Sequence, residues 1–365
     1  MKNLLHFITS TCLCLWVGFN STDEIKHSLQ IIHKGISLTK PVVCTLVEVT
    51  NDSALPHEFY MDVESVVCGD NQCKIDVVRI YWDELGRFNK LVLPKDVHLE
   101  KAEGISFTDT DYKKLNDILK NEDSPLQDVF KDEIVGTVGG EGVDAMSGET
   151  ILLEKSAYVK GAVWTCYSLW HWVHGDIKQH IKDITGKSYS KQDLRLLLKQ
   201  KDYQAFAIEQ LTKKEDYSKQ TVRAILNAIE TNPSLLKSSL PYWENAPKSK
   251  YVFGSEELLS MLKPTNRMLF LTSILQTQQE LSPDFFNQLT PLISEFTYQE
   301  IDIFLNILKE KQMITNNIIQ SIIPLLKAEN FIKSRRAYYF LEGMDLSKEN
   351  ERKTSDFFEK WKDRL

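Results

Sequence analysis

The sequence changes character partway along, and this change limits the folds that the chain can adopt. Residues 25–95 contain short runs rich in Val, Ile, Tyr and Phe, separated by turn-forming residues, which is the pattern of β-strands. From about Gln192 onward, helical patterns follow one another with few strand signals. We therefore predict an α+β chain, with an antiparallel sheet first and an all-α region afterwards. The expected domains are residues 25–185 and 190–365.

Within the first domain, the strands are expected to form an antiparallel sheet with one covered face. Alternation between polar and apolar residues is clearest in Lys74–Tyr81, as in a strand that buries one side. The glycine of Asp83–Gly86 supplies a turn where the chain reverses. The predicted strands are Val43–Val49, Glu58–Val67, Lys74–Trp82 and Arg87–Leu93.

Two helices are expected in the remainder of this domain. Thr108 followed three residues later by Asp111 has the pattern of a helix cap, and apolar residues at helical spacing follow it up to about Asn121. A second helix, roughly Leu153–His174, carries a dense group of aromatic residues.

The C-terminal region contains a weak internal repeat. Pro291 and Pro324 lie 324 − 291 = 33 residues apart, and each has apolar residues at matching positions on both sides. Pairs of helices that repeat at about this period are typical of α-solenoids, whose units bury their apolar faces against their neighbours. The pattern resembles HEAT-type helical repeats, so the expected all-α region is solenoid-like.

The first 22 residues have the features of a signal peptide. Lys2 places a positive charge at the start, and Leu4–Val17 is mostly apolar. This apolar stretch is short for a permanent membrane-spanning helix. No later segment is apolar enough to cross a membrane, so no permanent transmembrane helix is expected. The protein is therefore expected to be exported, to the periplasm or the extracellular space.

Four cysteines follow the predicted signal peptide: Cys44, Cys68, Cys73 and Cys166. An even number of cysteines in an oxidising compartment favours disulfides, and four cysteines allow three pairings. Cys68 and Cys73 flank turn-forming residues between two predicted strands, so this hairpin is the natural site of a bridge. Zinc is the alternative, but no second cysteine pair completes a tetrahedral set.

The formal net charge of −7 disfavours nucleic acid as a partner. A protein that binds nucleic acid needs a basic face to neutralise phosphates. The runs of Lys and Arg in this sequence are short and lie near acidic residues.

A glycine-rich loop leads into the run Asp144-Ala-Met-Ser-Gly-Glu-Thr150, which carries the strongest functional signal. It resembles the D-x-x-[S/T]-G-A-T signature of the FMN-binding domains of bacterial membrane-linked electron-transfer proteins. Four of the five specified positions match, Asp144, Ser147, Gly148 and Thr150, and Glu149 replaces the usual alanine. The resemblance covers roughly residues 64–175.

This resemblance implies a covalent cofactor. In the family, FMN is joined to the last threonine by a phosphoester bond that a separate flavin transferase makes, so Thr150 is the expected attachment site. Ser147 and Asp144 would hold the turn, and Gly148 would let the transferase approach. A structural alternative is that Thr150 simply caps the following helix.

His171 and His174 form a second candidate site, because residues three apart on a helix share a face. They can hold a metal or a haem iron, although hydrogen-bonded histidines inside a core are the more common case. No Cys-x-x-Cys-His motif supports covalent haem.

Three functions are compatible with these patterns. The first is an exported electron carrier with FMN on Thr150, whose helical repeats dock a redox partner; a membrane-bound partner is compatible with this function. The second is a protein-interaction scaffold without a cofactor. The third is a metal-dependent enzyme built around His171 and His174.

Overall fold

The computed structural model describes residues 23–50, 55–66, 75–130 and 154–365. The chain divides into two compact units, Met1–Ser188 and Tyr189–Leu365, which we describe separately. The predicted signal peptide (1–22), Cys68, Cys73 and the motif from Asp144 to Thr150 lie outside the described residues, so the predictions on them stay predictions.

The first unit contains a five-stranded antiparallel sheet in which each strand pairs with the next in the chain. The prediction of an α+β chain with an N-terminal antiparallel sheet is confirmed. The four predicted strands are present with small shifts at their ends, and one further strand precedes them. The strands are β1 (Glu24–Ile31), β2 (Val42–Thr50), β3 (Pro56–Glu64), β4 (Val77–Asp83) and β5 (Phe88–Val92).

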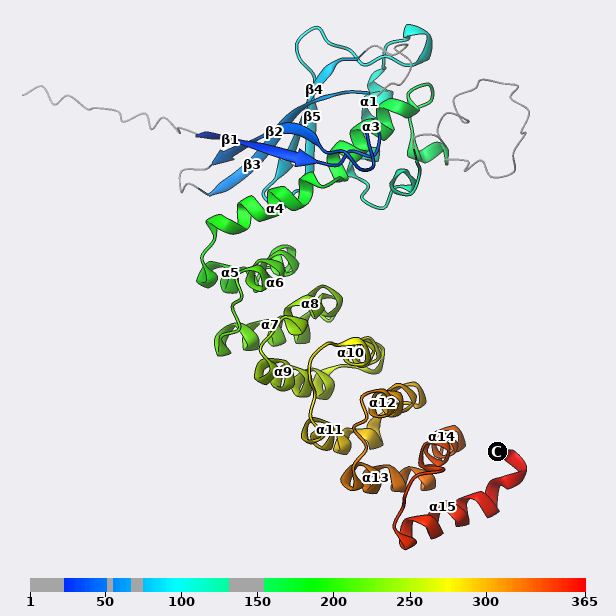
Figure 1. The fold of residues 1–365 in the computed structure, drawn as a ribbon. Helices are drawn as coiled ribbons and strands as arrows, with labels where there is room; N and C mark the ends of the chain where they lie inside the picture. The colour runs from blue at the N-terminus through cyan, green and yellow to red at the C-terminus, as the bar shows by residue number, and fades with distance from the viewer. Residues whose placement is uncertain (1–22, 51–54, 67–74, 131–153) are drawn as a thin grey trace, which may run out of the picture. The chain divides into compact units, whose positions relative to one another are not determined.

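One face of this sheet forms the core together with helices. Because neighbouring residues of a strand point to opposite faces, Phe59 of β3 and Trp82 of β4, which are register partners, lie on the same buried face. The helices α1 (Asp109–Lys120), α3 (Val163–His174) and α4 (Ile177–Ser188) complete the unit (Figure 1). The indole Nε1 of Trp82 donates a hydrogen bond to the carbonyl of Val173, 3.1 Å away, which joins β4 directly to α3.

Residues next to the first turns of α1 and α3 explain where these helices begin. The hydroxyl of Thr108 accepts from the backbone N–H of Asp111, whose carboxylate accepts from the backbone N–H of Thr108, so α1 begins with the expected capping box. The second predicted helix was placed too early, because α3 begins at Val163 and not at Leu153. Gly161, just before it, has φ +80, a left-handed backbone conformation that no helix continues through.

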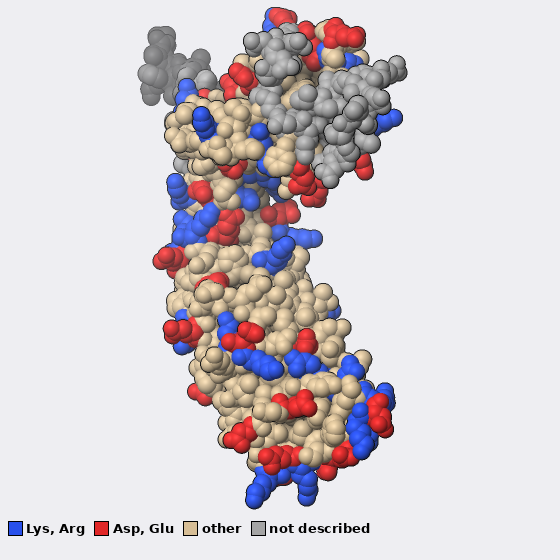
Figure 2. Space-filling view, turned by 45° about the vertical axis from the view of Figure 1, so that its right-hand side comes forward, with Lys and Arg blue, Asp and Glu red and all other residues tan. Residues whose placement is uncertain are grey.

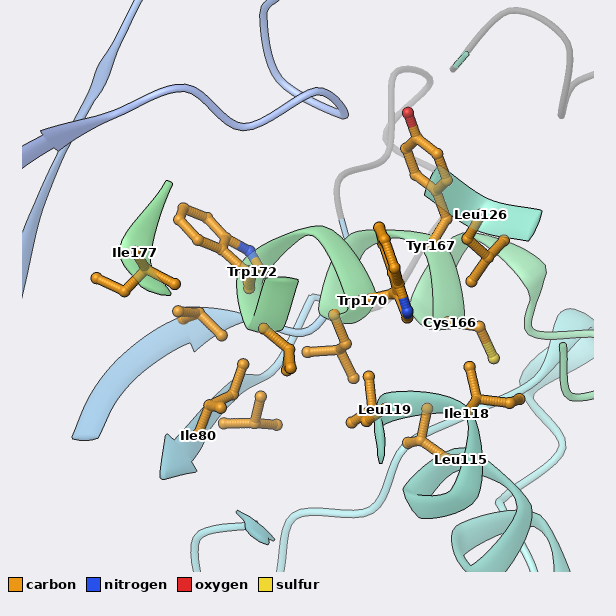
Figure 3. Packing of buried hydrophobic residues seen from close by; sticks show 14 of the residues in the cluster. Ile80, Leu115, Ile118, Leu119, Leu126, Cys166, Tyr167, Trp170, Trp172 and Ile177 are labelled. Carbon is orange, nitrogen blue, oxygen red and sulfur yellow. The ribbon is translucent and has the colours of Figure 1, made fainter. Parts of the chain in front are cut away.

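The structure bears on the disulfide pairing that the sequence left open. Cys44 and Cys166, the two cysteines within the described residues, both carry free thiols. Cys44 lies on β2 opposite Leu29 of β1, whereas Cys166 lies on the α1 side of α3 (Figure 3). The sulfur of Cys166 accepts a hydrogen bond from the backbone N–H of Val159. Each of the three ways of pairing all four cysteines uses Cys44 and Cys166, so none of them forms. The bridge between Cys68 and Cys73 alone stays a prediction.

The second unit is helical throughout, apart from short 3-10 turns and connections. Its helices alternate between two sets of contacts. Helix α6 contacts α8, α10 contacts α12 and α12 contacts α14, while α7 contacts α9, α9 contacts α11 and α11 contacts α13. The helices are α5 (Lys191–Leu197), α6 (Gln204–Lys213), α7 (Lys219–Thr231), α8 (Leu235–Glu244), α9 (Lys248–Met261), α10 (Pro264–Gln276), α11 (Pro283–Leu289), α12 (Tyr298–Glu310), α13 (Asn316–Ile322), α14 (Phe331–Leu341) and α15 (Lys348–Trp361).

Pro291 and Pro324, which lie 33 residues apart in the predicted repeat, occupy equivalent places in the structure. Pro291 and Pro324 each occupy the second position of a 3-10 turn that directly follows a seven-residue helix, α11 or α13. Proline suits this place because its ring fixes φ near the helical value and it has no N–H that needs a partner.

A buried ion pair connects α10 and α12. Arg267 Nε lies 2.5 Å from Glu300 Oε1, and both side chains are almost completely buried. The second oxygen of Glu300 accepts from the backbone N–H of Thr297 at the start of α12. Burial by itself would raise the pKa of Glu300, but the hydrogen bonds from Arg267 and Thr297 outweigh it and lower that pKa.

Charged side chains of both signs are interspersed on the face drawn in Figure 2. Within the part of the chain that the structure describes, no helix combines the length and the apolar character needed to cross a membrane.

We predict that Gly254→Ala destabilises the second unit. A Cβ at this position would lie 2.3 Å from Cζ3 of Trp243, a fully buried side chain, so the ring must move. Overpacking of this kind costs about 1–3 kcal/mol of unfolding free energy. Urea unfolding would measure the loss, with Ser249→Ala, an exposed position on the same helix, as the matched control. Equal stability of the two variants would contradict the described packing.

Candidate functional site

Aromatic and imidazole side chains gather around α3, and we call this group the α3 cluster. Because the motif residues Asp144, Ser147, Gly148 and Thr150 lie outside the described residues, the geometry of the candidate site comes from this cluster. It consists of His33, Tyr167, Trp170, His171, Trp172 and His174.

Helix α3 can carry this cluster because it has no polar face. All of its residues except Trp164 and His174 are buried. A helix that is apolar all round must be enclosed by other elements. Figure 3 shows how this happens: Cys166 and Trp170 face the side of Leu119 and α1, while Tyr167 points away from them. The helix therefore presents different aromatic groups to its different neighbours.

Each ring of the α3 cluster contacts at least one other ring of the cluster. Tyr167 and His171, one helical turn apart, have ring centroids 4.4 Å apart in an edge-to-face arrangement. Trp170 lies 5.1 Å from His171 and 4.7 Å from His174. His33 comes from the connection between β1 and β2, and its ring lies 4.2 Å from that of Trp172. These distances are in the range of favourable aromatic contacts.

Backbone carbonyls fix the protonation of the histidine rings. His33 Nε2 lies 3.0 Å from the carbonyl of Ser168, and His174 Nε2 lies 2.8 Å from that of Leu119. A carbonyl only accepts, so in each ring Nε2 carries the hydrogen and Nδ1 carries a lone pair. The ring of His171 makes a backbone hydrogen bond at Leu126, and its Nε2 has no partner among the described residues.

All three imidazoles are neutral at physiological pH. Burial lowers the pKa of His33 to about 4 and that of His171 to about 3, and the nearby ring of His33 adds to the second shift. Burial also lowers the pKa of His174. The cause is the same in each case, because the charged imidazolium loses its hydration inside the core.

The rings of His171 and His174 do not form the shared metal site that their helical spacing allowed. The two rings bond to different backbone groups, and each of them contacts the ring of Trp170. In the described ranges, no three His, Cys, Asp or Glu side chains lie close enough to hold a metal ion. The closest ring neighbours of His171 are instead Tyr167, Trp170 and His33. Nothing in the sequence pointed to His33, because it is a single histidine in a connecting segment.

No protein-family model, no curated protein and no solved structure matches this chain. The motif in the sequence and the geometry around α3 are therefore the observations on which a functional argument can be built.

We predict that stability falls in acid because of the buried imidazoles. Their pKa values are lower in the folded chain than the ordinary 6.5, so their contribution to stability is complete above pH 6.5 and is lost as the pH falls towards 4. For His33 the loss is on the order of 3 kcal/mol.

Urea unfolding at pH 7 and at pH 4.5 would measure this effect. His33→Gln is expected to reduce the difference in unfolding free energy between the two pH values. The matched control is His57→Gln at an exposed position, which should leave the difference unchanged. If both variants keep the full pH dependence, the buried imidazoles are not its source.

Proposed function

We propose that this protein is an exported electron carrier that holds FMN covalently on Thr150. The observation that carries the proposal is the run from Asp144 to Thr150, which matches four of the five specified positions of the flavin-attachment signature and comes before the aromatic helix α3 in the chain. The carrier would pass electrons between a membrane donor and an acceptor outside the cytoplasm. As a carrier, it would need no turnover reaction of its own.

Attachment would be the work of a separate flavin transferase. The hydroxyl oxygen of Thr150 attacks the phosphorus of the FMN half of FAD, a new P–O bond forms, and the bond between the two phosphates breaks. AMP leaves, and the hydroxyl proton passes to a base of the transferase. Threonine is inert until it is activated in this way. Gly148 suits such a site because a glycine lets another chain approach the backbone closely.

A flavin ring needs an apolar, aromatic cover and a small number of polar groups that tune its potential. The rings of Tyr167, Trp170 and Trp172 are each at most 5% exposed, so they belong to the core and not to such a cover. Trp164, the half-buried tryptophan of α3, is the ring of this helix that would face a flavin.

The second unit would dock the redox partner. We propose that its helices form HEAT-like repeats, which is supported by the two alternating sets of helix contacts and by the equivalent places of Pro291 and Pro324. Stacked helical repeats offer long surfaces for protein partners.

An interaction scaffold without a cofactor is the alternative function. It is favoured by large apolar side chains that the second unit exposes near its end, because contiguous exposed apolar groups mark binding surfaces. Ile332 and Tyr339, two turns apart on α14, and Phe358 on α15 are each more than two-fifths exposed. In this case Thr150 would carry no flavin and the helical unit alone would perform the function.

We predict that Thr150→Ala abolishes covalent flavin attachment. The full chain, co-expressed with a flavin transferase and exported, should gain the mass of one FMN group and stay yellow after acid precipitation. Thr150→Ala should remain colourless and unmodified, because it lacks the oxygen that forms the ester. Thr150→Ser, which keeps a hydroxyl, is the matched control and should still be modified. An unmodified wild-type chain under these conditions would favour the scaffold.

We further predict that Glu149→Ala speeds the modification. A carboxylate next to the phosphodiester adds like-charge repulsion of about 1 kcal/mol when exposed. Removing it should raise the initial rate of FMN attachment about fivefold, measured by intact mass over time. Glu149→Gln removes the charge at nearly constant size and should give most of the same gain. A slower rate for both variants would show that the transferase uses the carboxylate.

A further inference from the structure

Arginine and aromatic side chains gather in the second unit, where the last residues of the chain lie beside α14 (Figure 1). The rings of Phe331 on α14 and Trp361 on α15 have centroids 4.9 Å apart. Arg364 Cζ lies 4.4 Å from the centroid of Phe331 and 5.1 Å from that of Trp361, and Arg335 Cζ lies 5.9 Å from the ring of Phe331. We call this group, with two neighbours on α14, the arginine–aromatic patch: Phe331, Ile332, Arg335, Tyr339, Trp361 and Arg364.

Neither guanidinium of the patch is paired with an acidic side chain. In the described part of the chain, Arg335 and Arg364 form no hydrogen bond or ion pair beside these ring contacts. The carboxylate of Glu359, which is near Arg364 in the sequence, pairs with Lys362 Nζ at 2.9 Å instead. A guanidinium interacts with an aromatic ring through its face, while its N–H donors point outward in its own plane. The donors of both arginines are therefore available to a partner.

The arginine–aromatic patch is open to solvent and is held by its own contacts. Phe331, Arg335 and Tyr339 follow one another at intervals of four residues, so they lie along one side of α14. Tyr339 Oη donates a hydrogen bond to the backbone oxygen of Leu365, 2.8 Å away, which fastens the last residues beside α14. Ile332 is 47% exposed and Tyr339 is 42% exposed, although both side chains are large. Side chains that are already ordered lose less entropy when a partner binds.

The chemistry of the patch selects the partner. Trp, Tyr and Arg are the residues that contribute most to binding at protein interfaces, and the patch combines all three. A guanidinium with free donors binds a carboxylate through two parallel hydrogen bonds, whereas a basic partner would meet like charge. The chain as a whole has a net charge of −7 and would repel an acidic partner, so a local cationic group of this kind is needed to attract one. The exposed Ile332 favours an apolar side chain beside the carboxylates.

We propose that the arginine–aromatic patch binds an acidic segment of a partner protein, in which carboxylates stand next to apolar side chains. Arg335 and Arg364 bind the carboxylates, and Ile332 and Tyr339 pack against the apolar side chains. This inference rests on the proposal that the second unit docks a partner, but not on flavin attachment at Thr150. It applies to an electron carrier and to a scaffold alike.

Fluorescence anisotropy with labelled short peptides tests the need for charge, using the full chain without flavin. The probe is a peptide of alternating Glu and Leu, and the control peptide has Gln in place of every Glu. We expect the Glu peptide to bind, to bind more weakly in added salt, and to lose affinity about tenfold in Arg335→Gln/Arg364→Gln. Arg223→Gln/Lys237→Gln removes two exposed cations from α7 and α8 and should bind as the wild type does.

Three results of this experiment overturn the proposal: no binding of the Glu peptide, equal binding of both peptides, or unchanged affinity in Arg335→Gln/Arg364→Gln. Each of them leaves the flavin proposal standing, because that proposal is tested separately by the mass of the chain with and without the hydroxyl of Thr150.

The apolar part of the patch and the other possible occupants need their own measurements. Ile332→Ser should weaken binding of the Glu peptide about threefold, whereas Leu196→Ser, at a 51% exposed leucine of α5, should leave it unchanged. Both positions are exposed, so both variants should keep the fold, which circular dichroism would check. Sedimentation of the free chain tests for a second copy as occupant. A dimer that Arg335→Gln/Arg364→Gln dissociates overturns the proposal, and so does tighter binding of single-stranded RNA than of the Glu peptide.

Discussion

The absence of a polar face on α3 is the constraint from which the architecture of the first unit follows. A helix with almost every side chain buried cannot lie on a surface, so it needs cover on all sides. The inner face of the sheet, α1 and the β1–β2 connection provide that cover. Each large apolar side chain enclosed in this way contributes about 1.5–3 kcal/mol relative to an exposed one. The bond from Trp82 to Val173 then fixes how α3 meets the sheet.

Enclosing such a helix also buries the polar imidazole groups of its histidines. Backbone carbonyls accept hydrogen bonds from these rings and so reduce the cost of burying them. The carbonyls of Ser168 and Leu119 each take one imidazole N–H. Burying a polar group costs little when it is hydrogen-bonded and much more when it is charged, so the rings remain neutral. The rings of His33 and His171 therefore do not change charge when the pH varies around neutrality.

Local patterns in the sequence predicted the elements better than they predicted contacts. The alternation in the predicted strand and the cap at Thr108 depend on neighbouring residues, and both are confirmed, the alternation over Val77–Asp83. The start of α3 was wrong because the left-handed backbone at Gly161 has no strong signal in the surrounding residues. The likeness of Pro291 to Pro324 located two equivalent turns, since a proline constrains its own backbone wherever it occurs.

The candidate site was less predictable, for a physical reason. The contact between His33 and Ser168 joins positions 135 residues apart, and only the folded chain brings them together. His171 and His174 lie at a spacing that fits a shared ligand, yet the carbonyl that each ring bonds decides where it points. The number of cysteines left the pairing open for the same reason, because it does not tell whether Cys44 and Cys166 approach a partner.

The burial of Cys166 has a practical consequence. Its thiol is fully enclosed, and burial raises its pKa to about 12, so the reactive thiolate is almost absent at neutral pH. Alkylating reagents and foreign disulfides would reach this sulfur only when α3 separates from α1 and the strands above it. The chain thus contains a native chemical probe whose labelling rate would follow the opening of its first unit.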